Sequence, residues 1–276
     1  MKVESLHIYP VKGLRVVDLQ AATVERRGFA HDRRWMLVDA AGKFITQREQ
    51  PKLATLAAEA TERGLRITGP VGTVEIARPA NDALRLPVTL WKQQIEGHAA
   101  SGEADAWFSN FLGLPCRLVW QGDLPRPTSE QYAPGAEASY ADGFPFLVTL
   151  AASLDDLNRR MPKPLPMNRF RPNIVISGAS AWAEDGWKKI RVGSVTLDIV
   201  KPCLRCVVTT TDQQTGAKES NEPLNTLKHF RLLRQPGLTG VVFGQNAVPA
   251  TLGRIVVGDI VEVLETQAPP AFAAVG

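Results

Sequence analysis

Short apolar runs separated by turn residues dominate the first half of the chain and predict a β-rich fold. Strands are predicted where apolar residues alternate with polar ones or cluster, at residues 3–10, 34–38, 44–48, 65–68, 74–77 and 88–91. Turn-forming pairs such as Ala41-Gly42 and Gly69-Pro70 separate these runs. Many short strands with frequent turns are typical of barrels and sandwiches, so we expect residues 1–120 to form an N-terminal β-barrel-like domain.

A helix is predicted over residues 102–112, where apolar residues have helical spacing and Ser101 can cap the first turn. The polar, proline-rich stretch over residues 121–140 predicts a long surface loop or a crossing between domains.

A second domain is predicted over residues 121–266. We expect strands at residues 146–150, 174–177, 190–192, 195–200, 241–243 and 255–264, and helices at 154–161 and 222–233. Ser153 is the expected cap of the first of these helices. Residues 267–276 predict a frayed tail. The whole pattern predicts an α+β fold that is rich in β structure, with a few helices.

Composition narrows the class of protein. The 276 residues carry 32 Lys and Arg against 28 Asp and Glu, a net charge of +4, and only three cysteines. So few cysteines exclude a disulfide scaffold. No stretch approaches the roughly 20 apolar residues of a membrane helix, and the N-terminus lacks the apolar segment of a signal peptide, so we expect a cytoplasmic protein with no membrane partner. The small basic excess permits an anionic ligand, and a nucleic-acid-binding barrel is the less favoured alternative.

The pair Cys203-Leu204-Arg205-Cys206 is the clearest candidate for chemistry. A β-branched run over residues 207–211 follows it and predicts a strand, which disfavours the helix that a thioredoxin-like motif opens. Iron–sulfur clusters and structural zinc usually need more thiolates than this chain offers. Two interpretations stay open: one thiolate binds a metal that brings its other ligands along, or both cysteines are small buried residues.

Basic segments near Lys12-Gly13, Arg33 and Arg171-Pro172-Asn173 are candidates for an anion site, because arginine forks match phosphate oxygens. Each segment can also be a solvated turn. In that case Asp32 would form a surface ion pair with Arg33 or Arg34, worth under ~1 kcal/mol.

These segments together carry a family resemblance. Their order along the chain is Tyr9-Pro10-Val11-Lys12-Gly13, Asp32-Arg33-Arg34-Trp35, Arg171-Pro172-Asn173-Ile174, Cys203-Leu204-Arg205-Cys206 with Thr209-Thr210 and Asp212, and Phe243-Gly244-Gln245. That order resembles the MOSC proteins with an N-terminal β-barrel domain, the group of the YcbX-like proteins and the mitochondrial amidoxime-reducing component. The implied fold is a β-barrel-like domain followed by a MOSC β-barrel domain.

The resemblance implies a molybdenum cofactor, Mo-molybdopterin, whose metal Cys206 ligates as the catalytic residue. The implied cofactor-binding residues are Lys12, Gly13, Arg33, Gly143, Phe144, Arg171, Asn173, Leu204, Arg205 and Cys206. Cys203 would either contact the cofactor-binding residues without touching the cofactor itself, or simply be buried. Gly13 and Gly143-Phe144 depart from the mitochondrial members, which have Ser and Thr-Ser there, so contacts at these positions would come from the backbone.

The implied activity is reduction of N-hydroxylated compounds, such as hydroxylamine-type base analogues or amidoximes. No ferredoxin-type cysteine motif follows residue 264, so electrons would come from a separate ferredoxin, flavoprotein reductase or cytochrome. The alternative is a carrier of the cofactor or of sulfur that turns over no substrate. Asp212 is expected to form a turn before Gly216.

Overall fold

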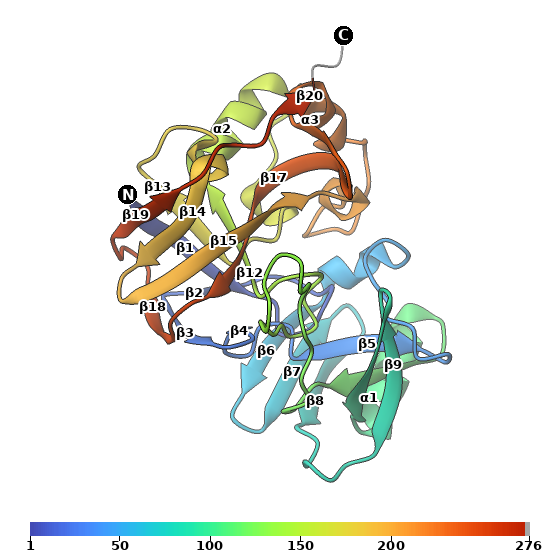
Figure 1. Ribbon diagram of the computed structural model, residues 1–276. Coiled ribbons are helices and arrows are strands. Elements are labelled where there is room, and N and C mark those ends of the chain that lie inside the picture. Colours follow the sequence, from blue (N-terminus) through green and yellow to red (C-terminus); the bar gives the residue numbers. More distant parts are fainter. Residues whose placement is uncertain (274–276) are drawn as a thin grey trace.

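The computed structural model describes residues 1–273, which fold into two β-rich lobes (Figure 1). The upper lobe contains a ten-stranded sheet in the order β19-β14-β15-β17-β12-β13-β1-β2, with β16 pairing to β17 and β20 to β16. Its strands are β1 (Lys2–Ile8), β2 (Val17–Leu19), β12 (Phe146–Leu150), β13 (Ile174–Ser177), β14 (Trp187–Val192), β15 (Val195–Leu204), β16 (Leu232–Gln235), β17 (Leu238–Pro249), β19 (Val261–Thr266) and β20 (Phe272–Ala273). A small sheet of β18 (Gly253–Val256), β3 (Ala21–Glu25) and β4 (Gly28–Phe29) adjoins it.

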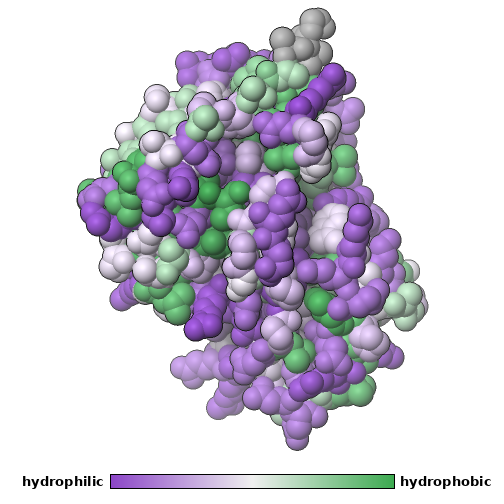
Figure 2. Space-filling view, in the orientation of Figure 1, coloured by the Kyte–Doolittle hydropathy of each residue, from purple (hydrophilic) through white to green (hydrophobic). Residues whose placement is uncertain are grey.

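The lower lobe contains two antiparallel sheets. One has the order β5-β11-β10-β9 and the other β6-β7-β8. The strands are β5 (Trp35–Asp39), β6 (Ala57–Thr61), β7 (Gly64–Gly69), β8 (Gly72–Ala77), β9 (Arg85–Leu90), β10 (Gln93–Ala99) and β11 (Cys116–Trp120). Polar side chains cover most of the face shown in Figure 2 on both lobes.

Few helices accompany the sheets. They are α1 (Gly102–Leu112), α2 (Ala151–Arg160) and α3 (Leu224–Phe230), with short 3-10 helices η1 (Pro51–Thr55), η2 (Met167–Arg169), η3 (Ala183–Gly186) and η4 (Val207–Thr210). As predicted, Ser101 caps α1, and its hydroxyl accepts the N–H of Ala104 at 3.3 Å. Within the described residues, no helix is long and apolar enough to cross a membrane.

The two lobes are interleaved rather than consecutive. Strand β1 pairs with β13, and β3 pairs with β18, so these early strands belong to the upper lobe although the predicted division falls at residue 120. Each lobe has its own apolar core, one around Phe29, Phe146 and Ile176 and the other around Leu37, Ile67 and Phe108. The chain therefore crosses between the lobes more than once, and the crossings form the seam.

Several local predictions are wrong, and each has a local physical reason. Residues 44–48 form only a single bridge, between Phe44 and Val38, before the chain turns at residues 47–49. The β-branched run after Cys206 forms η4 instead of a strand, and the hydroxyls of Thr209 and Thr210 support this turn by donating to the carbonyls three residues earlier. Residues 121–140, predicted as a surface loop or a crossing between domains, form the crossing from β11 to β12 and bury Arg126 and Tyr140.

Three helix and tail predictions also need correction. Helix α2 starts at Ala151, so Ser153 lies inside it, where its hydroxyl donates to the Glu184 carboxylate instead of capping the helix. Helix α3 ends at Phe230, because the following residues enter β16. The tail expected to fray from residue 267 includes β20, whose Phe272 pairs with Leu233. Residues 274–276 of that tail lie outside the described residues.

We expect Phe29→Ala to destabilise the fold strongly. The Phe29 ring is fully buried and meets the edge of Phe146 with ring centroids 4.9 Å apart, so its removal leaves a cavity in the upper core. The expected loss is about 3–5 kcal/mol of unfolding free energy, measured by urea denaturation. Leu84→Ala is the control, because Leu84 is 68% exposed, and should change stability by less than about 0.5 kcal/mol. Equal losses in both variants would contradict this account of the core.

Candidate functional site

A cleft of about 780 Å³, partly open to solvent, lies at the seam between the lobes. The cleft is lined by Lys12, Gly13, Arg33, Thr46, Gln47, Arg48, Ala141, Asp142, Gly143, Phe144, Phe146, Leu147, Phe170, Arg171, Asn173, Cys203, Arg205, Cys206, Val208 and Asn246. All the predicted site residues except Leu204 are therefore brought together in one cavity.

The Asp32 carboxylate is fully buried beneath the cleft and joins three segments. One oxygen accepts the backbone N–H of Tyr9 at 2.8 Å. The other accepts Arg33 Nη1 at 2.5 Å and Asn173 Nδ2 at 3.1 Å. The Asp32–Arg33 pair is thus a buried structural pair and not the surface ion pair considered as one alternative.

Asn173 connects the strands at the base of the cleft. Its Oδ1 accepts the backbone N–H of Leu147 and Arg33 Nη1, each at 3.2 Å, and its Nδ2 donates to the His7 carbonyl at 3.2 Å. Because every polar atom of this amide has a protein partner, Asn173 positions β1, β12 and β13 relative to Arg33. Its contribution to any ligand is mainly to hold that arrangement.

Arg171 and Arg33 lie against the ring of the buried Tyr9. Their guanidinium carbons are 4.1 Å and 4.4 Å from the ring centroid. Arg171 Nη1 donates to the Leu14 carbonyl at 2.8 Å and to Gln213 Oε1 at 3.1 Å. Burial lowers the pKa of Arg171 to about 10, so the side chain stays charged at neutral pH. Two arginines stacked on one ring concentrate positive charge at this end of the cleft.

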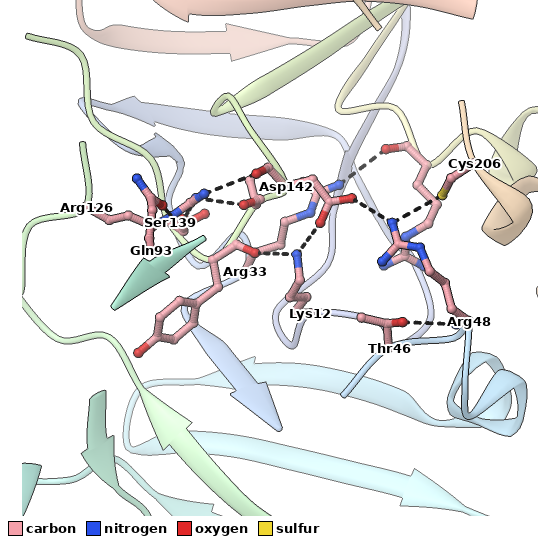
Figure 3. Close-up of polar contacts among 12 residues, drawn as sticks. Lys12, Arg33, Thr46, Arg48, Gln93, Arg126, Ser139, Asp142 and Cys206 are labelled. Carbon is pink, nitrogen blue, oxygen red and sulfur yellow. Dashed lines mark hydrogen bonds and ion pairs between the residues drawn. The ribbon is translucent and has the colours of Figure 1, made fainter. Parts of the chain in front are cut away.

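Asp142 is shared by cations on either side of it (Figure 3). Lys12 Nζ donates to one carboxylate oxygen and to the Tyr140 carbonyl, the latter at 2.8 Å. Arg48 Nη2 lies 3.9 Å from the other oxygen. Desolvation would raise the pKa of Asp142, but the charges of Lys12, Arg48 and Arg33 outweigh it and hold the pKa well below its usual range. The carboxylate is therefore ionised at neutral pH and binds cations rather than donating a proton.

Arg126 fixes the backbone that carries Asp142. This arginine is buried, and its Nη1 donates to the carbonyls of Ser139 and Ala141 at 2.6 Å and 2.7 Å, while its Nη2 donates to the Asp142 carbonyl at 3.1 Å (Figure 3). Its Nε donates to Gln93 Oε1 at 2.9 Å. A segment without regular secondary structure is thereby held in one conformation.

The two cysteines of the motif have different partners. Arg48 Nη2 lies 3.3 Å from Cys206 Sγ, and its guanidinium carbon lies 4.4 Å from the centroid of the Trp91 ring. Arg205 Nη1 lies 2.9 Å from Cys203 Sγ, and its Nη2 donates to the Phe170 carbonyl at 2.7 Å. Arg205 thus contacts Cys203 and the backbone of the cleft wall, whereas Cys206 contacts Arg48.

Leu204 turns away from the cleft. It packs in an apolar cluster with Leu233, Leu238, Val242 and Phe272. Its neighbours Cys203 and Arg205 line the cavity because residues alternate sides along the end of β15.

Asp212 forms the predicted turn. Its Oδ1 accepts the backbone N–H groups of Gln214 and Thr215, each at 2.9 Å, and its Oδ2 accepts Arg169 Nη2 at 2.9 Å. Asp212 therefore ties η2 to the segment that follows η4 and does not line the cleft.

Sequence reasoning missed Arg48, Asp142 and Arg126. Arg48 fell within a predicted strand, and nothing in the local pattern distinguished it from other basic residues. Asp142 directly precedes Gly143-Phe144, and that position was the only sign of its role. Arg126 lies in a segment whose polar, proline-rich composition favours exposure.

No protein-only metal site is present in the part of the chain that the structure describes. Within residues 1–273, no group of three or more His, Cys, Asp or Glu side chains is placed to hold a metal ion. Both thiols of the motif, Cys203 and Cys206, line the cavity together with Lys12, Arg33, Arg48, Arg171 and Arg205. This donor set fits an anionic group that brings its own metal and most of its ligands, and it does not fit a bare metal ion.

Comparison with known proteins places the chain in a family. Residues 1–115 match the MOSC N-terminal beta barrel domain, and residues 136–262 match the MOSC domain. The chain belongs to the MOSC proteins with this N-terminal domain, which confirms the resemblance found in the sequence and agrees with the β-rich α+β fold.

Curated relatives of this chain share one name. Mitochondrial amidoxime-reducing component 1 of Mus musculus is 35% identical over 279 residues, covering 95% of this chain and 82% of the relative. The protein of the same name from Homo sapiens is 34% identical over 280 residues, with the same coverage of 95% and 82%. Mitochondrial amidoxime reducing component 2 of Bos taurus is 33% identical over 251 residues, covering 83% of this chain and 72% of the relative.

We expect Lys12 to titrate far below other lysines. Burial lowers its pKa to about 8, although Asp142 opposes the shift. A pH titration of the lysine side-chain NMR signals should show one signal with a midpoint near this value. That signal should be absent from the spectrum of the Lys12→Gln variant. Asp142→Asn should move that midpoint lower still, because the anion that favours the charged ammonium is removed. A midpoint unchanged by Asp142→Asn would contradict the assigned ion pair.

Proposed function

We propose that this protein binds a molybdenum cofactor in the cleft and uses it to reduce N-hydroxylated compounds. The observation that carries the proposal is a cavity lined by the two thiols of the motif, Cys203 and Cys206, and by five cationic side chains, with no protein-only metal cluster among the described residues. Homology to proteins named amidoxime-reducing components supports the substrate class.

The cleft offers the proposed cofactor two kinds of contact. Cys206 supplies one thiolate to the metal, which suffices because the pterin brings a dithiolene of its own. Lys12, Arg33 and Arg171 supply positive charge for the phosphate and the ring. The backbone of Gly143 is also available, because open space surrounds the position that a Cβ atom would occupy there.

The bound group would supply two-electron redox chemistry, in which an N–OH group, two electrons from the donor protein and two protons from solvent give N–H and water. The chain's own contribution is placement and charge. Arg126 and Lys12 hold Asp142 at the cleft, and Asn173 and Asp32 orient Arg33. Arg48 lies beside Cys206 and is the side chain through which the protein adjusts charge at the thiolate.

Electrons must reach the site from another protein under this proposal. We propose a separate donor: a ferredoxin, a flavoprotein reductase or a cytochrome. We further propose a cytoplasmic location, where the three free cysteines of this chain would stay reduced.

Metal analysis of two cysteine variants tests the ligand assignment. We expect molybdenum in the purified wild-type protein, a fall of more than about tenfold in Cys206→Ala, and near wild-type content in Cys203→Ala, since Cys203 contacts Arg205 instead. Reduction of benzamidoxime with a chemical electron donor should follow the same order. Equal molybdenum retention in the two variants would refute Cys206 as the ligand.

A second measurement separates the reductase from a cofactor or sulfur carrier. The wild-type protein is reduced without substrate, and oxidation of its molybdenum is then followed by the optical absorption of the metal centre after addition of several N-hydroxylated compounds. Substrate-dependent oxidation supports the reductase. Molybdenum that stays reduced with every compound would favour the carrier.

A further inference from the structure

A second cavity, of about 640 Å³, lies elsewhere along the seam between the lobes and shares no lining residue with the first cleft. Its walls come from the ends of β1, β3, β7 and β11, the turn before β5 and the segment after β8. It is lined by Pro10, Glu25, Arg27, His31, Arg34, Trp35, Ala60, Gly64, Leu65, Arg78, Trp120, Gly122 and Asp123. The proposed cofactor chemistry uses none of these side chains.

Positive charge is in excess in this cavity. Its lining places Arg27, Arg34 and Arg78 with two carboxylates, Glu25 and Asp123, and Arg27 Nε also lies 4.0 Å from a carboxylate oxygen of Glu137, which does not line the cavity. Glu25 pairs with Arg34, while Asp123 is 3.5 Å from Arg27 and is itself 90% exposed. No carboxylate among the described residues lies within ion-pair distance of Arg78, whose Nη2 donates to the Glu62 carbonyl at 3.3 Å.

Arg34 is the most buried charged side chain that lines the cavity. It is only 9% exposed, and its one side-chain hydrogen bond to a described residue goes to Glu25. Its other guanidinium nitrogens have no hydrogen-bond partner among the described residues, yet none of them is fully buried, so they can be reached from the cavity. An oxyanion in the cavity would satisfy the donors that Glu25 leaves free.

His31 adds a polar group that has no hydrogen-bond partner among residues 1–273. Its backbone is in the left-handed region at φ 67°, which is uncommon for a residue other than glycine and is often found at functional sites. Partial burial lowers the pKa of His31. Glu25 opposes that effect, and the charges of Arg78 and Arg34 add to it. The imidazole therefore senses the positive potential of the cavity.

Apolar surface accompanies the charge. Pro10, Leu65, Trp35 and Trp120 contribute to the walls, and the two indole rings lie 6.2 Å apart by their centroids. A bare phosphate or carboxylate ion would make no contact with these apolar walls. The combination fits a small organic molecule that carries one oxyanion group.

We propose that this second cavity binds a small organic oxyanion, a phosphate or carboxylate compound, through Arg34, Arg78 and His31. The site is distinct from the cofactor cleft because Arg33 and Arg34, adjacent in sequence, line different cavities. The proposal does not depend on the proposed molybdenum chemistry.

Calorimetric titration of the full chain with phenyl phosphate, benzoate and inorganic phosphate tests the proposal. We expect saturable binding of phenyl phosphate or benzoate with a Kd below about 1 mM, and weaker binding of inorganic phosphate. Comparison of the first two probes decides between a phosphate and a carboxylate ligand. Absence of saturable binding by both organic probes would overturn the proposal.

Matched variants locate the binding. Arg78→Gln and His31→Asn should each raise the Kd of the probe by about tenfold, which is the effect of one lost charge-assisted contact. Asparagine is chosen because it tolerates a positive φ. Arg66→Gln removes the same charge from an exposed site on β7, where Arg66 pairs with Glu59 and Glu75, and should change Kd by less than twofold. Circular dichroism confirms that each variant is folded.

Two results would contradict the assignment. An equal effect of Arg66→Gln and Arg78→Gln would mean that net charge, and not the cavity, attracts the probe. Loss of binding in Arg48→Gln but not in Arg78→Gln would place the probe in the first cleft instead.

Discussion

The buried carboxylate of Asp32 is the interaction on which the arrangement of this molecule depends. It binds the backbone of Tyr9 at the end of β1, the guanidinium of Arg33 and the amide of Asn173 before β13. Removing one partner of such a buried network leaves unpaired polar groups, which costs several kcal/mol. The same network holds the backbone of Arg33 at φ 50°, a conformation that needs support from its surroundings. The two lobes thus meet at a polar junction rather than an apolar one.

The cleft follows from that junction. Because Asp32 and Asn173 hold Arg33, and Tyr9 carries both Arg33 and Arg171 on its ring, positive charge is concentrated where the segments meet. Among residues 1–273, Asp142 is the one carboxylate that lines the cleft, and it is shared by Lys12 and Arg48. The remaining charge is available to an anionic ligand, which agrees with the mild basic excess of the whole chain. A cofactor site and a structural junction are here the same group of residues.

Much of the candidate site could be predicted from the sequence because its residues lie in short motifs of unusual composition. Lys12, Arg33, Arg171, Asn173 and Cys206 all line one cleft, although more than 190 residues separate the first from the last. Arg48 and Arg126 could not be found in this way. Each is a single arginine in a stretch of sequence with no distinctive motif. The role of Arg48 depends on Cys206, which is far away in the chain, and the role of Arg126 depends on the carbonyls of residues 139, 141 and 142, which lie in an irregular segment.

The sequence by itself determined the family, the β-rich fold class and the residue types of the site, because apolar periodicity and motif order are local properties of the chain. Only the tertiary structure decided which way each side chain points. Arg33 and Arg34 are neighbours yet enter different cavities, and Leu204 packs in an apolar cluster while Cys203 and Arg205 beside it line the cleft. Likewise, the first strands joined the upper lobe because β1 pairs with β13, a contact between residues about 170 positions apart. Such choices depend on long-range pairing and burial, which no short stretch of sequence contains.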